Sequence, residues 1–318
     1  MGNRLTRPLL LLLASALFAF QPSLRHGTMV REASLRVTPR VDAEKLVNLE
    51  RGRDLIILDQ TNVENQQWLR VYVMIPQEER APREITGWIT GKGVVTAATT
   101  NGDQIVYGEA VDSENQAEQR GGRKGAALDA MRLYYRLTEI FPSSPLAAES
   151  MWRAADIRWQ LEKAEVLARP SAREMDPDAR TPMDDQNLKQ LQKKYPNSKW
   201  ADLAAYDLID NKLCGNWKGL AICPEKESDI YEHYAREHPR SPKAAEALYN
   251  AAWRQAALAD IYGINNETAK SAGARKKAIV LAQEISNQYA ALEDWKARAL
   301  ALIYKLEQGI AVYGSQRE

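Results

Sequence analysis

The chain has 318 residues, of which 45% are hydrophobic and 27% charged, so it can bury a sizeable core and hold more than one domain. Its 43 basic and 42 acidic residues give a formal net charge of +1 and are mixed along the chain. Because nucleic-acid binding depends on clustered Lys and Arg, this composition argues against nucleic acid as a partner.

The N-terminus has the layout of a secretory signal peptide, which we assign to residues 1–22. Arg4 and Arg7 precede an apolar run that extends from Pro8 to about Phe20 and contains small residues near its end. The run is short for a bilayer span, whereas a positive head and a cleavage site of small residues are typical of a signal peptide. We therefore expect an exported protein, periplasmic or extracellular. Membrane association through an uncleaved signal is the alternative.

Residues 28–97 are predicted to form short strands. Apolar alternations such as "DLIILDQ" and "WLRVYVMI" are separated by turn signals such as "ERGRD", a spacing typical of a small β-barrel or sandwich. The region resembles a bacterial SH3-like (SH3b) domain through four landmarks in order: Leu35–Val37 followed by Pro39, Leu49–Gly52, Trp68–Val71 and Gly87–Ile89. The stretch "MIPQEERAPRE" departs from that family by lengthening the loop before the last landmark.

The SH3-like resemblance implies a ligand groove, which such folds commonly line with aromatic side chains. Tyr72 and Trp88 are the candidates for this groove, with cell-wall peptide or a protein segment as the ligand. Packing in the core is the alternative for the tryptophan, because a large ring is ordinary core material. The fold alone does not determine the ligand.

Residues 98–124 differ in composition from the strands before them. They are weakly hydrophobic, rich in Thr, Asn, Gly, Gln and Glu, and end in "QRGGRKG". We expect a polar linker here, with one short strand near Gln104–Tyr107.

From residue 125 the pattern becomes helical, and one phrase recurs three times: "FPSSPLAAES" from Phe141, "YPNSKWADLA" from Tyr195 and "HPRSPKAAEA" from His238. Apolar residues seven and four places before each ring share one helix face, and the Pro after the ring ends that helix. The Ser three places after the ring suits a helix N-cap, and the Ala six places after it permits close helix packing. The phrase therefore predicts the turn of a helical hairpin, with a weaker fourth copy at Tyr289.

These phrases resemble tetratricopeptide-like repeats, especially those of outer-membrane assembly lipoproteins of the BamD type and related periplasmic coordinator proteins. The resemblance covers about Ala126 to Tyr313, within a helical region that we assign to residues 125–318. Two departures matter. The lipid-anchoring Cys is missing, and the phrases are spaced more widely than standard repeats. We therefore expect inserted loops at about 169–183, 214–224 and 263–272.

Stacked helical hairpins present a concave surface that typically holds an extended or helical peptide. Arg132, Arg136, Arg153 and Arg158 lie near positions that would line such a surface. Their guanidinium groups could bind the carboxylates of a protein partner in bidentate fashion. Solvation of an outer helix face is the alternative.

The two cysteines, Cys214 and Cys223, are predicted to form a disulfide, because an oxidising compartment permits one and the bond would close a short glycine-containing loop. A zinc site would need two further ligands, and the only histidines are His26, His233 and His238. We find no constellation typical of a nucleophile or a phosphate loop. We therefore expect no metal, no cofactor and no enzymatic activity.

The sequence thus predicts a multidomain protein with a small all-β SH3-like barrel followed by an all-α solenoid of helical hairpins. We expect a non-catalytic scaffold of the cell envelope that tethers a cell-wall or peptide ligand to a protein partner. Two alternatives stay open. One is an outer-membrane assembly factor or periplasmic chaperone, and the other is a regulatory or targeting subunit of a cell-wall hydrolase.

Overall fold

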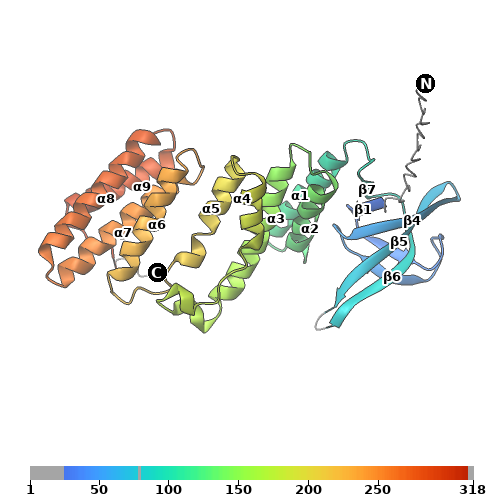
Figure 1. The fold of residues 1–318 in the computed structure, drawn as a ribbon, viewed down its shortest axis with the longest axis horizontal. Coiled ribbons are helices and arrows are strands. Elements are labelled where there is room, and N and C mark those ends of the chain that lie inside the picture. The colour runs from blue at the N-terminus through green and yellow to red at the C-terminus, as the bar shows by residue number, and fades with distance from the viewer. Residues whose placement is uncertain (1–24, 78–79, 314–318) are drawn as a thin grey trace, which may run out of the picture.

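A computed structural model describes residues 25–77 and 80–313 and divides them into a β region and a row of helices that extends away from it (Figure 1). The expected two-part architecture is confirmed. The signal assigned to residues 1–22 lies outside the described residues. Within the described part of the chain, no helix is both long and apolar enough to span a bilayer.

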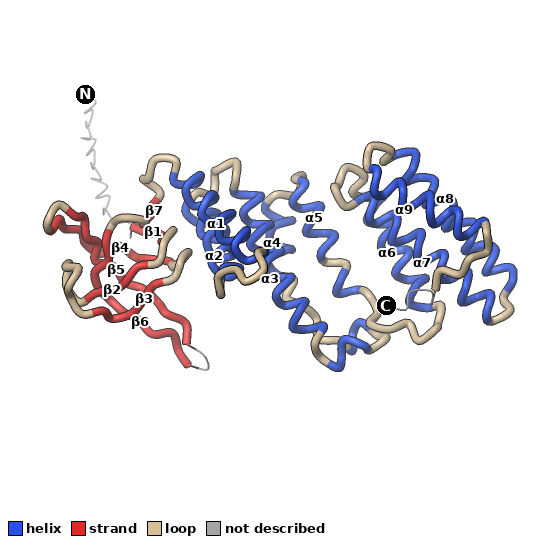
Figure 2. The backbone as a smooth tube through the Cα atoms, turned by 180° about the vertical axis from the view of Figure 1, so that it is seen from behind, coloured by secondary structure: helices blue, strands red, loops and turns tan. Residues whose placement is uncertain are grey.

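The β region is one antiparallel sheet that curls into a half-barrel (Figure 2). It is larger than the small barrel that the sequence predicted. The spatial order of its strands is β3-β2-β6-β5-β4-β1-β7. Their bounds are β1 Arg25–Met29, β2 Ala33–Arg36, β3 Lys45–Leu49, β4 Asp54–Val63, β5 Gln66–Gln77, β6 Arg80–Thr90 and β7 Val94–Thr96.

Alternating apolar residues fill the concave side of this sheet, as the period of a half-buried strand requires. Leu35, Leu55, Val71 and Ile89 are all fully buried there. The stretch before Gly87, in which the sequence predicted a lengthened loop, instead continues β5 and β6 as a long hairpin. These residues were predicted as loop from the sequence, but they pair across the two strands.

The helical region holds nine α-helices between residues 102 and 307. Their bounds are α1 Gly102–Glu118, α2 Ala126–Ile140, α3 Ala147–Leu167, α4 Gln186–Lys194, α5 Lys199–Asp207, α6 Ile222–Glu237, α7 Ala244–Ile264, α8 Thr268–Gln288 and α9 Glu293–Glu307. Residues 98–124 therefore do not form the expected polar linker or strand. Most of them form α1, which packs along α2. Its buried positions are the small residues Gly102, Val106, Ala110 and Ser113, which explains its weak hydrophobic signal.

The recurring phrase is the turn of a helical hairpin at all three places and at the fourth, degraded copy. Each ring residue ends its helix by donating its backbone N–H to the carbonyl four residues earlier, over 2.8 to 3.0 Å. The four rings are Phe141, Tyr195, His238 and Tyr289. The Ala six places after each of the first three rings is buried, as predicted. Of the three serines, Ser198 is the N-cap, with its hydroxyl accepting from Ala201 N at 3.2 Å.

The three larger apolar clusters of the helical region follow one another along the row of helices. The first joins α1, α2 and α3 to the sheet through Val30 and Val95, the second packs α3 against α4 and α5, and the largest joins α6 to α9. The loop insertion expected at 263–272 is wrong, because α7 ends at Ile264 and α8 begins at Thr268. Continuous helix on both sides of that short turn gives the last hairpins their length.

Candidate functional site

The turn between β3 and β4 is docked on α2. Arg132 Nε donates to the carbonyl of Arg51 at 3.1 Å, and Arg136 Nε donates to the carbonyl of Gly52 at 3.4 Å. Gly52 has φ of +72°, and a Cβ there would lie 2.5 Å from Arg132 Cβ. Only glycine permits both this backbone conformation and this close approach.

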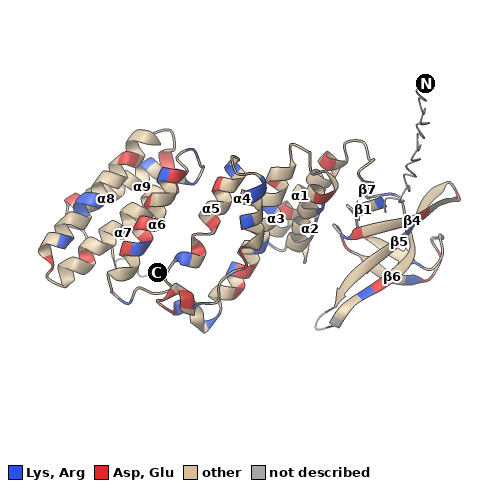
Figure 3. Ribbon diagram, viewed as in Figure 1, with Lys and Arg blue, Asp and Glu red and all other residues tan. Residues whose placement is uncertain are grey.

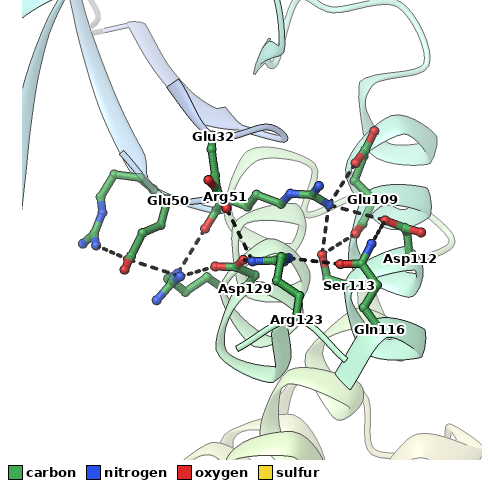
Figure 4. A network of polar contacts seen from close by, with 11 residues as sticks. Glu32, Glu50, Arg51, Glu109, Asp112, Ser113, Gln116, Arg123 and Asp129 are labelled. Carbon is green, nitrogen blue, oxygen red and sulfur yellow. Dashed lines mark hydrogen bonds and ion pairs between the residues drawn. The ribbon is translucent and has the colours of Figure 1, made fainter. Parts of the chain in front are cut away.

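A network of charges extends this contact to α1 (Figure 4). Arg51 Nη1 lies 3.5 Å from Glu109 and 3.4 Å from Asp112. Arg123 and Arg132 both pair with Asp129, whose side chain is only 4% exposed. The network thereby links the sheet to α1 and α2 through carboxylates on both helices, which fixes their relative orientation.

Three cavities adjoin this junction, and the Arg136 side chain lines all three. The sheet cavity, about 250 Å³, has Ile56, Tyr72 and Met74 in its wall together with Arg132. The helix cavity, about 220 Å³, lies among α2, α3 and α4. The charged cavity, about 590 Å³, lies where β1, β4 and α2 meet. These cavities make the junction the best candidate for a binding site in the described chain.

The junction brings together residues that the sequence assigned to two separate surfaces. Tyr72, proposed for the groove of the sheet, shares the sheet cavity with Arg132 and Arg136, proposed for the helical face. Partial desolvation and then the carboxylate of Glu84 raise the pKa of the Tyr72 hydroxyl, which therefore stays a neutral donor. Trp88 lies apart, half-buried on β6 and paired with Arg70 of β5.

The remaining two arginines separate. Arg158 lines the helix cavity with Arg132 and Arg136, and its half-exposed side chain pairs with Asp184 at 2.6 Å. Arg153 does not reach that surface. Its guanidinium bonds to Glu114 of α1 at 2.7 Å and Glu149 of α3 at 3.0 Å, so it holds those helices together.

Sequence reasoning missed the apolar floor of the helix cavity. Met131, Tyr135 and Met151 line it, and Tyr135 is 42% exposed. A signal for part of it was available, because Leu128, Met131 and Tyr135 recur at intervals of three and four and none of them is fully buried, although Met131 packs partly against the first apolar cluster. A second apolar stripe on one helix is typical of a binding surface.

Cys214 and Cys223 form a disulfide with a Cα–Cα separation of 6.0 Å. The loop that it closes is tied to α6 by the buried carboxylate of Glu227, which accepts from Cys214 N and Trp217 Nε1 and pairs with Arg254 at 2.7 Å. The bond therefore braces the turn into the last four helices and lies far along the chain from the junction.

The most perturbed carboxyl group lies between hairpins, not at the junction. Burial, followed by the charges of Asp156 and Asp210, raises the pKa of Asp207 to about 7. Its Oδ2 is buried with no hydrogen-bond partner among the described residues. This group belongs to the packing of α5, and we place no chemistry on it.

Neither the charges nor the metal-ligating side chains point to another site. Basic and acidic residues alternate over the ribbon without a large region of one sign (Figure 3). In residues 25–77 and 80–313, no three His, Cys, Asp or Glu side chains are placed to hold a metal ion together. Neither a known family model nor a curated protein matches the sequence.

Proposed function

We propose that this chain is an exported, non-catalytic binding protein of the cell envelope. The sheet, SH3-like by sequence resemblance, holds a cell-wall or other peptide ligand, and the tetratricopeptide-like hairpins hold a protein partner. One observation carries the proposal: Tyr72 of the sheet and Arg132 and Arg136 of the helices line a single cavity at the junction.

The sheet cavity has the chemistry of a peptide site. Ile56, Met74 and Pro76 offer an apolar wall for a side chain, and the Tyr72 hydroxyl, beside the carboxylate of Glu84, offers a polar group. Ligand sites are commonly apolar clefts with a few convergent polar groups of this kind. The Nε atoms of Arg132 and Arg136 donate to the β3–β4 turn, which holds both side chains in place as a fixed polar edge of the cavity.

The helix cavity suits a protein segment. Its floor of Met131, Tyr135 and Met151 can take an apolar side chain, and methionine adapts its shape to different partners. Arg158, at the rim and 47% exposed, can exchange Asp184 for a carboxylate of the partner. The two cavities share Arg132 and Arg136, so both ligands would lie on adjacent faces of α2 and the protein would tether them at short range.

The same apolar floor supports a second candidate function, that of an outer-membrane assembly factor or chaperone. A chaperone would use Met131 and Tyr135 to hold many unfolded segments, whereas a tether would hold one defined partner. The number of partners therefore separates these two functions.

Sedimentation with purified cell-wall sacculi tests the sheet ligand. We expect the full chain without residues 1–22 to co-sediment, and Tyr72→Ala to lower the bound fraction at least fivefold. Tyr304→Ala on the exposed face of α9 is the matched control and should bind like the parent protein. If the parent protein does not sediment, wall binding is contradicted.

A photo-crosslinking residue in place of Tyr135 tests the helical face. We expect one defined adduct in envelope preparations, absent when the crosslinker replaces Tyr304. A broad distribution of adducts with unfolded polypeptides would instead favour the chaperone function.

A further inference from the structure

The charged cavity has no role in the function proposed above. It is the largest of the three junction cavities, at about 590 Å³, and lies beside the sheet cavity because both share Asp54 and Arg136. Arg25, His26, Glu139 and the small residues Ala97 and Ala98 also line it. A volume of this size is within the range of small-ligand sites, roughly 300–1,000 Å³.

Asp54 is the least satisfied acid in this cavity. Its carboxylate lies 3.7 Å from His26 Nδ1 and 3.9 Å from Arg136 Nη1, both beyond hydrogen-bond length. No hydrogen bond to its side chain is formed by the described residues. An ionised carboxylate has about four acceptor positions, so Asp54 is free to accept donors from a ligand.

The wall of the cavity holds charges of both signs. Arg25 and Arg136 supply two guanidinium groups, and Asp54 and Glu139 supply two carboxylates. Arg25 Nη1 lies 3.4 Å from Gln60 Oε1, and Glu139 pairs with Arg136, so Asp54 is the carboxylate of this wall that accepts no hydrogen bond from the described residues. An ammonium group of a ligand can therefore donate to Asp54.

Arg136 adds a donor for the same ligand. Its Nε is used by the carbonyl of Gly52 and its Nη1 by Glu139, whereas Nη2 has no partner among the residues described. The free donor Arg136 Nη2 and the free acceptor Asp54 match the start of a peptide chain. There an ammonium, which donates, is followed two atoms later by a carbonyl, which accepts.

We propose that the charged cavity binds the free amino-terminal end of a short peptide. The α-ammonium donates to Asp54, the first carbonyl accepts from Arg136 Nη2, and small side chains lie against Ala97 and Ala98. The remainder of the peptide continues into the sheet cavity toward Tyr72. This inference rests on the proposed function, because it names the ligand class of the sheet.

Calorimetry with alanyl-alanine amide and its N-acetyl derivative tests the role of the ammonium. We expect the free amide to bind the full chain without residues 1–22, and the acetylated probe to bind at least tenfold more weakly. Asp54→Asn should reduce binding of the free amide at least tenfold, and Asp54→Glu should restore part of it. Asp59→Asn, exposed on the same strand, is the matched control and should change nothing.

Equal binding of the two probes, or no binding of either at millimolar concentration, would overturn the inference. The thermal unfolding temperature of Asp54→Asn must stay close to that of the parent protein. If Asp54→Asn is destabilised, the binding of the two probes to Asp54→Glu is the test instead. Displacement of the protein from sacculi by the free amide would identify the wall as the source of the ligand. Binding of the amide without displacement would identify soluble peptides. Sedimentation that persists while both probes fail would leave the proposed function standing without this ligand.

Discussion

At the junction, Arg51, Arg123 and Arg132 each meet a carboxylate, whereas the contact between α7 and α8 is made of alanines and aliphatic side chains. The C-terminal contact excludes water over a long and closely approached pair of helices. The junction instead combines a small apolar cluster with ion pairs and bonds to the carbonyls of a single turn.

The difference teaches how each part is held. Apolar packing supplies stability roughly in proportion to area and is almost indifferent to salt. Charged contacts add little net stability when they are partly exposed, but they are directional and penalise wrong orientations. We infer that apolar packing of the C-terminal helices mainly supplies stability. The charged contacts at the junction hold the sheet at a defined angle to α2, and the cavities that the sheet and α2 share depend on that angle.

The largest expected effect concerns the apolar half. Leu281 of α8 is buried, and Leu281→Ala should lower the free energy of unfolding by about 2–5 kcal/mol through lost burial and a cavity. Its neighbour Val280 is 52% exposed, so Val280→Ala is the matched control and should cost less than about 1 kcal/mol. Denaturant unfolding at low and high salt measures both. A strong salt dependence of the Leu281 effect would contradict the comparison.

Gly52→Ala should break the junction without changing its charge. The left-handed backbone costs an alanine about 1–2 kcal/mol, and the Cβ would also clash with Arg132, so we expect a total loss of about 2–4 kcal/mol. Gly93 has φ of +84°, but its nearest neighbour would be 3.5 Å away, so Gly93→Ala isolates the backbone cost. Hydrogen exchange of α2 should accelerate only in the first variant. Equal losses for both would show that the close approach to α2 is unimportant.

The hairpin turns could be predicted from sequence because their chemistry is local. In the three full copies the ring, Pro and Ser lie within four residues of one another, and each of these copies closes the same backbone hydrogen bonds. α1 could not be predicted because its buried face consists of Gly102, Ala110 and other small residues, which bury area only once α2 is beside them.

The candidate site was predictable only in pieces. Tyr72 was found as an aromatic of the sheet and Arg136 as a cation of the helices, but nothing in one dimension indicates that they line one cavity. The shared cavity exists because Gly52 docks on α2, which is a contact between residues far apart in the sequence. Asp54 was missed altogether, because a single aspartate at the start of a strand is ordinary until its surroundings are known.

An intermediate effect on the free energy of unfolding is expected at Asp207, which lies at the end of α5 between the junction and the C-terminal helices. Its pKa of about 7 in the folded protein lies above its ordinary value, so the folded state holds a proton that the unfolded state releases. Between about pH 4 and pH 7 the free energy of unfolding should therefore fall as pH rises, by on the order of 1–3 kcal/mol.

Asp207→Asn should flatten this part of the stability profile, and Asp178→Asn, exposed in the connection after α3, should leave it unchanged. Denaturant unfolding at pH 5 and pH 8 measures the slope. A profile that still falls as steeply in Asp207→Asn would assign the proton to another carboxyl, of which Asp156, with its pKa also raised by burial, is the first to examine.

The smallest effect is expected from Arg51→Gln, and it tests the orienting role of charge most directly. Arg51 is 19% exposed and meets Glu109 and Asp112 at 3.4 to 3.5 Å, so its loss should cost less than about 1 kcal/mol at low salt and nearly nothing in 1 M NaCl. Hydrogen exchange of α1 should nevertheless rise in 50 mM NaCl, because the helix loses its link to the β3–β4 turn. Arg240→Gln, exposed after α6, should change neither quantity. Unaltered exchange of α1 in Arg51→Gln would mean that the apolar cluster around Val30 and Val95 alone sets the angle of the sheet.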